Sequence, residues 1–110
     1  MLKVDMEYNN GILYVRLNGV LDRKATYKIN NYIIPVVLKH KIKYLVFNLF
    51  DLKDIDECGL DALLNTKCAI KSNKGKICLC EVSDFISNKI KRVRMKVASN
   101  ELAANHLINI

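Results

Sequence analysis

The sequence predicts a single-domain α/β fold over residues 1–110: a mixed β-sheet opened by an N-terminal hairpin, with about four α-helices packed on it. Three observations support this prediction. Segments whose apolar residues alternate, as in strands, are interleaved with segments whose apolar residues recur at helical spacing. An Asn-Gly pair joins the first two alternating segments, which is the strongest local signal for a hairpin. The length and the 51% hydrophobic content suit one domain with its own core.

The first half of the chain contains the hairpin and one helix. Residues Leu2–Tyr8 alternate apolar with polar side chains, and Ile12–Leu17 repeats the alternation after the turn Asn9–Gly11. Ala25–Lys39 carries apolar residues at helical spacing, so we expect a helix there. Pro35 lies inside that pattern. Because proline lacks a backbone N–H, we expect a kink or an interruption at this position.

The second half alternates strands with helices. Turn residues set the boundaries: Ser83 and Asp84 are expected to cap one helix, and Gly75 to end another in left-handed geometry. The expected elements are a buried strand at Tyr44–Asn48, a polar connection carrying Asp51, Asp54 and Asp56, a helix at Cys58–Ser72, a strand at Lys76–Glu81, a helix from Phe85 to about Lys91, a basic edge strand at Arg92–Val97 and a last helix from Ser99.

The composition disfavours several classes of protein. No apolar run reaches the ~18–20 residues that span a bilayer. The N-terminus alternates like a strand and lacks a signal peptide's apolar region, so we expect a cytoplasmic protein without membrane association. The four cysteines, Cys58, Cys68, Cys78 and Cys80, form no Cys-x-x-Cys pair, so neither a metal site nor a cofactor is expected. Cys78 and Cys80 share one face of a strand and are expected in the core.

The net charge of +7 comes from scattered lysines and one dense basic run, Lys89–Lys96. We expect this run to be a helix end, whose cations favour the negative helix terminus, followed by a charged edge strand. No aromatic residues interleave with the charges to stack bases, so nucleic acid is disfavoured as a partner. The basic run leaves one alternative open, an acidic partner bound through Arg92, Arg94 and Lys96.

Candidate binding residues cluster at the start of the helix expected at 58–72. Asp56, Glu57 and Cys58 fall on the turn between a buried strand and this helix, where folds commonly expose functional groups. Asp61 and Asn65 follow on the exposed side of the helix. The turn and the adjoining helix surface are therefore the first candidates for a binding site.

Motifs in separated parts of the chain occur in an order typical of one family. They are the turn Gly19–Asp22, the strand Leu45–Leu49, the turn Asp56–Leu60 and the tail Val97–Ala104, which carries a Ser-x-x-x-Ala pattern. Together they resemble the bacterial anti-sigma factor antagonists of the STAS domain family. The resemblance covers almost the whole chain and implies a STAS-like fold for the single domain at residues 1–110.

The resemblance implies a regulatory protein whose partner is an anti-sigma factor that is also a serine kinase. In the family the second turn reads Asp-Ser-Ser-Gly-Leu or close to it, and the kinase docks there and phosphorylates the second serine. A phosphate brings about −1.5 to −2 charges into the contact surface, which releases the partner. Here Asp56, Gly59 and Leu60 match the family, Glu57 replaces the first serine, and Cys58 replaces the phosphorylated one.

These matches imply a partner-binding surface. Its residues are Asp22, which matches a family aspartate in the loop after the hairpin, together with Asp56, Glu57, Cys58, Gly59, Asp61 and Asn65. The expected partner is an anti-sigma factor or serine kinase-like protein, or another signalling protein. A weak homodimer is a further candidate assembly.

Cysteine at the serine position admits four interpretations. The first is a binding protein that a serine kinase does not switch. The second is a redox sensor, since a helix N-terminus favours a thiolate, although Asp56 and Glu57 oppose it. The third is a nucleophilic enzyme, disfavoured because His40 and His106 are remote in sequence. The fourth is a neutral substitution in which Asp56 caps the helix. We expect partner binding without catalysis.

Overall fold

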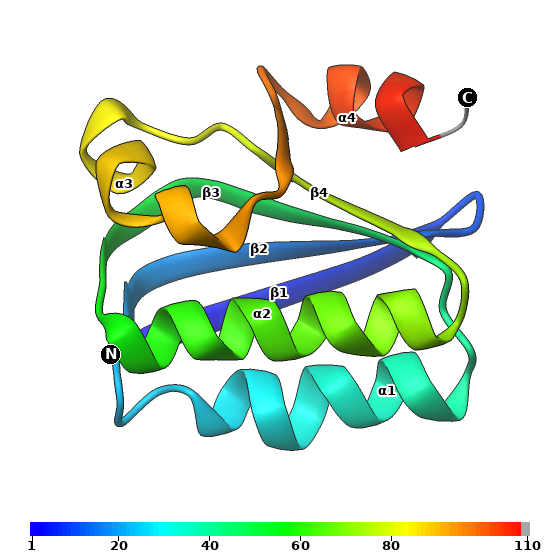
Figure 1. The fold of residues 1–110 in the computed structure, drawn as a ribbon, viewed down its shortest axis with the longest axis horizontal. Helices are drawn as coiled ribbons and strands as arrows, with labels where there is room; N and C mark the ends of the chain where they lie inside the picture. The colour runs from blue at the N-terminus through cyan, green and yellow to red at the C-terminus, as the bar shows by residue number, and fades with distance from the viewer. Residues whose placement is uncertain (109–110) are drawn as a thin grey trace.

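The computed structural model describes residues 1–108 as one mixed sheet with helices on both faces (Figure 1). The strands lie in the order β1-β2-β3-β4-β5, with β1 antiparallel to β2 and every other neighbouring pair parallel. They are β1 at Leu2–Asn9, β2 at Ile12–Leu21, β3 at Tyr44–Ile55, β4 at Lys76–Cys80 and β5 at Lys96–Ala98. The predicted fold class is confirmed. Residues 109 and 110, the end of the predicted domain, lie outside the described residues.

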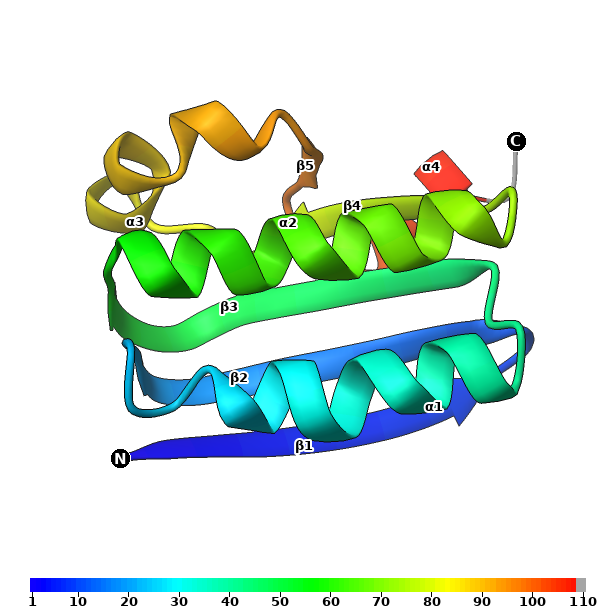
Figure 2. The same ribbon diagram turned by 60° about the horizontal axis from the view of Figure 1, so that its bottom comes forward.

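Helices α1 and α2 lie side by side on one face of the sheet, and α4 lies on the other (Figure 1, Figure 2). The helical segments are the π-helical turn η1 at Ile29–Ile33, α1 at Ile34–Lys39, α2 at Glu57–Ser72, α3 at Asp84–Lys89, the 3-10 turn η2 at Lys91–Val93 and α4 at Glu101–Ile108. Helical crossovers join the successive parallel strands, so the carboxyl ends of β2, β3 and β4 meet at one end of the sheet. The candidate site lies at this end.

The N-terminal hairpin forms as predicted. Strands β1 and β2 pair from Leu2 opposite Gly19 to Asn9 opposite Ile12. The turn residues between them, Asn10 and Gly11, have φ of 52° and 82°. Positive φ at both central residues is typical of the tight turn that an Asn-Gly pair favours.

Pro35 accompanies a change of helix type. The segment predicted as one helix from Ala25 begins with hydrogen-bonded turns, passes through η1 and continues as α1, with Pro35 in the first turn of α1. Proline is best tolerated in a first helical turn, where an N–H would lack an intrahelical acceptor. The segment stays helical through Pro35, so the predicted interruption does not occur at this residue; the irregularity is the π-helical turn that ends just before it.

The strand predicted to end at Asn48 is β3, which continues to Ile55. The prediction that Asp51 and Asp54 lie in a polar connection is therefore wrong. Strand β2 also runs past its predicted end, to Leu21, and pairs with β3 along the added length with two register shifts. The buried residues of this extension recur at every third position, at Leu49, Leu52 and Ile55. Such irregular pairing removes the two-residue alternation that identifies a strand in sequence.

Two other boundaries also differ from prediction. Left-handed geometry at the end of α2 is adopted by Lys74, with φ of 61°, and not by Gly75. Gly75 is required for another reason, because a Cβ there would lie 1.8 Å from the carbonyl oxygen of Lys43. The edge strand predicted at Arg92–Val97 is shortened to β5, because η2 and the left-handed Arg94 precede it.

The two later helices have side-chain caps. The Ser83 hydroxyl accepts a hydrogen bond from the Ile86 N–H at 3.2 Å, as predicted for the start of α3. The last helix begins at Glu101, two residues after its predicted start at Ser99, because the side-chain oxygen of Asn100 accepts the Ala103 N–H at 2.8 Å. An asparagine N-cap fixes a helix start in this way.

The sheet separates two apolar cores. The larger one, between the sheet and the helices α1, α2 and α3, contains Phe47, Leu63 and Ile86. The smaller one, under α4, contains Cys78 and Cys80, as the sequence predicted. Burial raises the pKa of the Cys78 thiol to about 11 and that of Cys80 to about 12. Both behave as packing residues.

A polar network attaches α4 to the sheet. The Arg16 guanidinium donates to both carboxylate oxygens of Glu101 at 2.8 Å, and Asn48 donates to the same carboxylate at 2.8 Å. These hydrogen bonds, the one from Arg16 being the larger cause, hold the pKa of Glu101 below its usual value. The second core is thus closed by a charge-assisted contact at the start of α4.

Candidate functional site

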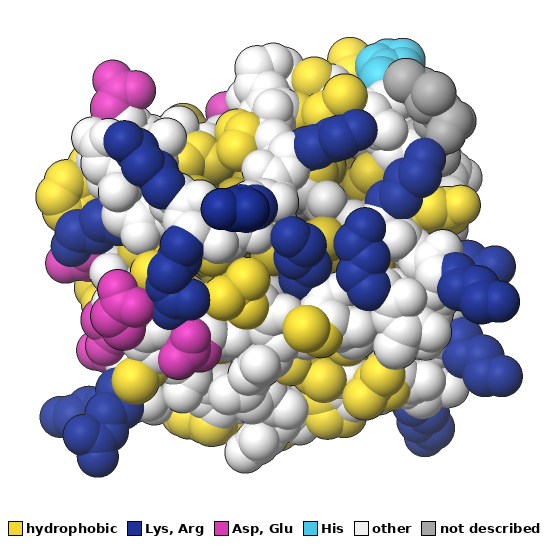
Figure 3. All heavy atoms as spheres, in the orientation of Figure 1, with side chains coloured by type: hydrophobic (Ala, Val, Ile, Leu, Met, Phe, Trp, Pro, Cys, Tyr) yellow, Lys and Arg dark blue, Asp and Glu magenta, His cyan; other side chains and the backbone are white. Residues whose placement is uncertain are grey.

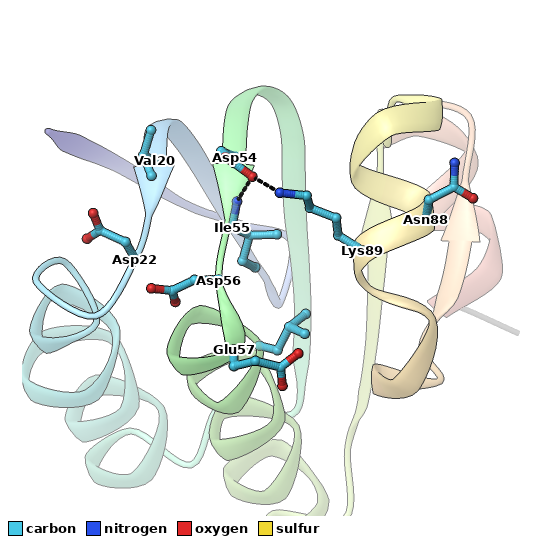
Figure 4. A pocket seen from close by; sticks show the side chains of 9 residues that line it. Val20, Asp22, Asp54, Ile55, Asp56, Glu57, Asn88 and Lys89 are labelled. Atoms are coloured by element: carbon cyan, nitrogen blue, oxygen red, sulfur yellow. Dashed lines mark hydrogen bonds and ion pairs between the residues drawn. The ribbon is translucent and has the colours of Figure 1, made fainter.

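An open hollow of about 700 Å³ lies at the end of the sheet where β2 and β3 finish and α2 begins. Figure 4 shows that its side chains come from β2, the loop after β2, β3, the start of α2, and α3. The lining residues are Val20, Asp22, Asp54, Ile55, Asp56, Glu57, Leu60, Asn88 and Lys89. The hollow therefore combines an apolar base with four carboxylates and one ammonium group.

Asp56 ties the start of α2 to the loop after β2. One carboxylate oxygen accepts the Gly59 N–H at 2.8 Å, which makes Asp56 the N-cap of α2. The other oxygen accepts the Arg23 N–H at 2.9 Å, and the Asp56 N–H donates to the Leu21 carbonyl at 3.3 Å. Because both carboxylate oxygens are engaged, Asp56 acts mainly by positioning these two segments. The prediction that Asp56 caps the helix is confirmed.

Gly59 allows α2 to approach the end of β2. It is buried, and a Cβ at this position would lie 2.2 Å from the Leu21 carbonyl oxygen and 2.7 Å from the Ile55 side chain. Any larger residue would push the first turn of the helix away from the sheet. Among the predicted partner-binding residues, Gly59 therefore adds no side-chain surface and instead sets the position of its neighbours.

Asp22 shapes the loop on the other side of the hollow. Its carboxylate accepts the Ala25 N–H at 3.1 Å, and its carbonyl accepts the N–H groups of Ala25 and Thr26. Such local side-chain bonds fix a turn. Asp22 and Asp56, remote in sequence, thereby line the same hollow.

Glu57, Cys58, Asp61 and Asn65 lie exposed along the first turns of α2. The Arg92 guanidinium, from η2, reaches across to Glu57 at 3.0 Å and Asp61 at 2.9 Å. The hydrogen bonds to Asp61 and Glu57 raise the pKa of Arg92. Figure 3 shows acidic side chains gathered over the beginning of α2, with Lys and Arg side chains above them and toward the end of that helix.

Lys89 links α3 to the end of β3 at the rim of the hollow. Its ammonium group lies 2.5 Å from the Asp54 carboxylate (Figure 4), and this hydrogen bond holds the pKa of Asp54 below its usual value. Neither Lys89 nor Arg92 was expected at this site from the sequence. They follow Asp54 and Glu57 by 35 residues each, so no local motif joins them, and only the crossover through β4 brings them together.

Comparison with known proteins identifies the family. The STAS domain model matches residues 3–102. The chain belongs to the STAS domain family. An anti-sigma F factor antagonist of Paenibacillus polymyxa is 27% identical to this STAS chain over 82 residues, which cover 74% of the chain and 70% of the relative.

Two solved structures resemble the whole STAS domain. The anti-sigma factor antagonist SpoIIAA in its unphosphorylated form has a TM-score of 0.79 and 19% identity, with all of both chains covered. An anti-sigma factor antagonist from Mycobacterium paratuberculosis has a TM-score of 0.83 and 16% identity, covering 100% of this chain and 96% of its own. At these identities the two structures establish the shared fold.

The STAS site brings no histidine near Cys58. His40 caps the C-terminal end of α1, at the opposite end of the helical layer from the start of α2 (Figure 1), and His106 lies in α4 on the other face of the sheet. The cation that does reach this turn, Arg92, makes its ion pairs with Glu57 and Asp61. Among the described residues, 1–108, neither histidine is therefore placed beside the Cys58 thiol.

The basic run is divided by the structure into residues with different contacts. Lys89 and Arg92 pair with acidic residues at the rim of the STAS site, whereas Lys96 lies on the edge strand β5. The sequence grouped Arg92 with Arg94 and Lys96 as one candidate surface for acidic partners. Since Arg92 already pairs with Glu57 and Asp61, it contributes less free positive charge to such a surface than the sequence suggests.

Proposed function

We propose that this STAS domain is an anti-sigma factor antagonist-like protein that binds a protein partner through the start of α2 and the loop after β2. The curated relative named as an anti-sigma F factor antagonist supports this function. The observation that carries the proposal is that Asp22, Asp56 and Glu57 line one open hollow beside the exposed α2 residues. The partner would be an anti-sigma factor, serine kinase-like or otherwise, or another signalling protein.

The charge of this surface predicts the chemistry of the partner. The side chains of Glu57 and Asp61 are 81% and 64% exposed, so each retains one side open to solvent beside its contact with Arg92. Asp22 and Asp56 add carboxylates across the hollow, and Lys89 offsets only Asp54. A partner with a complementary basic patch would therefore be steered to this end of the domain and held in register.

In this proposal, serine phosphorylation does not regulate the surface at the start of α2. Cys58 stands where the resemblance implies the phosphorylated serine, and a thiol is not the substrate of a serine kinase. Glu57 already supplies one negative charge beside it, and Arg92, which is shared with Asp61, balances that charge only in part. We therefore propose a cytoplasmic binding protein that acts without catalysis and is not released from its partner by phosphorylation at Cys58.

The test is capture of a partner from extract of the source bacterium, with ATP present, by wild-type protein and by Cys58→Ser. Captured proteins are identified by mass spectrometry, and the domain itself is examined by intact mass. Wild type is expected to retain an anti-sigma factor or kinase-like protein. Cys58→Ser is expected to gain the mass of one phosphate and to lose that partner. Cys68→Ser, at an exposed cysteine of the same helix, is the matched control and should behave as wild type.

A second pair of variants tests the surface itself. Asn65→Arg adds bulk and charge to the exposed side of α2, and Asn31→Arg makes the same change on exposed η1. The first is expected to abolish capture and the second to leave it intact. Capture that survives Asn65→Arg, or failure of wild type to retain any anti-sigma factor or kinase-like protein, would contradict the proposal.

A further inference from the structure

The outer edge of β1 is open. Among the described strands β1 stands at the end of the sheet and pairs only with β2. The Met1 carbonyl lies beside Gly19 of β2, whereas the next carbonyl, that of Leu2, accepts a hydrogen bond from the Lys28 ammonium group. Backbone groups alternate in direction along a strand of an antiparallel pair. The N–H and C=O groups of Val4 and Met6 therefore point away from the sheet.

A largely apolar groove runs beside this edge on the face that carries α1 and α2. A hollow of about 390 Å³ is lined by the apolar or aromatic residues Val4, Met6, Tyr27, Tyr32 and Ile33 and by one charged residue, Lys28. Met6 is 43% exposed and Tyr32 59% exposed, and Tyr8 continues the apolar row at 61%. Figure 2 shows α1 lying over β1 and β2, which leaves the outer side of β1 uncovered. A long strand edge with exposed apolar side chains is a template for pairing with another strand.

The opposite face of β1 carries the charges that select a partner. Lys3, Asp5 and Glu7 alternate with the apolar row and are exposed. Arg16, on β2, contacts Asp5 at 3.0 Å, Glu7 at 3.0 Å and Glu101 at 2.8 Å. A single guanidinium group thus forms ion pairs with three carboxylates. The face has an excess of negative charge around Asp5 and one lysine two residues away, at Lys3.

We propose that β1 is a self-association edge, which pairs antiparallel with β1 of a second copy of this chain about a two-fold axis at Val4. In this register Lys3 lies opposite the second copy's Asp5, and Asp5 opposite the second copy's Lys3. Cross-strand pairs of opposite charge are favourable, and like charges directly opposite are unfavourable. Moving the axis to Asp5 sets Lys3 opposite the second copy's Glu7 but also sets Asp5 against its own copy. Moving it to Met6 sets Asp5 against Glu7. The charges therefore select the Val4 register.

The same register satisfies the open edge and fills the groove. The two Val4 residues exchange backbone hydrogen bonds, and Met6 lies opposite the second copy's Leu2. The Leu2 carbonyl already accepts from Lys28, and it retains a second lone pair for the Met6 N–H. The two-fold axis brings the Tyr27 and Tyr32 rings of both copies to one seam, where they cover Met6. This interface is independent of the proposed partner surface at α2.

The test measures self-association by sedimentation velocity over a concentration series that reaches about 1 mM, the range of weak complexes. Wild type is expected to dimerise reversibly. Lys3→Glu places like charges opposite each other twice per dimer and is expected to weaken dimerisation about tenfold or more. Lys53→Glu, the same charge reversal at an exposed position of β3, is the matched control and should dimerise as wild type.

A mixing experiment separates pairing from a general loss of stability. Asp5→Lys alone sets two lysines opposite each other and is expected to be monomeric. Mixed with Lys3→Glu, it restores opposite charges in both cross-strand pairs, so a heterodimer should appear by native mass spectrometry. Thermal unfolding confirms that each variant is folded. A monomeric wild type at about 1 mM, unchanged dimerisation of Lys3→Glu, or no heterodimer from the two folded variants would each overturn the proposal.

Discussion

Asp56 offers the sharpest test of how the candidate site is built. Replacing it by alanine removes the N-cap of α2, which is worth about 1 kcal/mol, and the bond from the Arg23 N–H, worth about 1 kcal/mol more. We expect Asp56→Ala to lose about 2 kcal/mol of unfolding free energy, or roughly 8 °C in melting temperature for a domain of this size. Asp56→Asn keeps a cap acceptor for Gly59, but one side-chain position becomes a donor facing Arg23. It should therefore lose about half as much.

The assay is urea unfolding followed by far-UV circular dichroism, with thermal unfolding as a second measure. Asp51→Ala removes another exposed carboxylate, on β3, and serves as the control with an expected change within about 0.5 kcal/mol. The order of stability should be Asp51→Ala, then Asp56→Asn, then Asp56→Ala. If Asp56→Ala matches Asp51→Ala in stability, the Asp56 carboxylate does not join the start of α2 to the loop after β2.

Three further variants or measurements test other parts of the structure. Gly59→Ala should cost about 2 kcal/mol or more in urea unfolding, because the added methyl group meets the backbone of β2 and overpacks the contact. Glu101 has a depressed pKa when folded, so its contribution to stability is present above its ordinary value of 4.5 and is lost as pH falls through the folded pKa. The stability difference between wild type and Glu101→Gln should therefore shrink below about pH 4.5. Titration of native protein with an aromatic disulfide reagent should modify the two exposed cysteines quickly, with Cys78 and Cys80 reacting only on unfolding.

Local patterns predicted most of the fold. The hairpin follows from alternation around one Asn-Gly turn, and α2 follows from a long run at helical spacing with a capping residue before it. The length of β3 did not follow from its pattern. Its second half is strand because β2 pairs with it through two register shifts, and such pairing depends on residues remote in sequence.

The candidate site was predictable only in part, for the same reason. Asp56 and Glu57 adjoin in sequence, and the strand-to-helix turn indicated them. Lys89 and Arg92 were visible only as members of a basic run, which favours a solvated helix end when nothing else is known. Their partners lie on β3 and α2, so their role depends on where α3 and η2 pack. From sequence alone, a basic run that forms ion pairs with acidic residues elsewhere in the chain looks the same as a basic run that binds an external anion.

Asp56 and Gly59, which match the family motif, have structural roles that do not depend on phosphorylation. Asp56 caps α2 and binds the neighbouring loop, and Gly59 lets the helix abut β2. A chain without the serine switch would need both residues for folding. The match of Asp56 and Gly59 to the family motif is therefore evidence for the STAS fold, and it neither supports nor opposes regulation by phosphorylation. Cys58 is exposed on the same turn, so its replacement can change regulation without disturbing the scaffold. This separation is why Cys58→Ser is a clean test of regulation, whereas Asp56→Ala tests architecture.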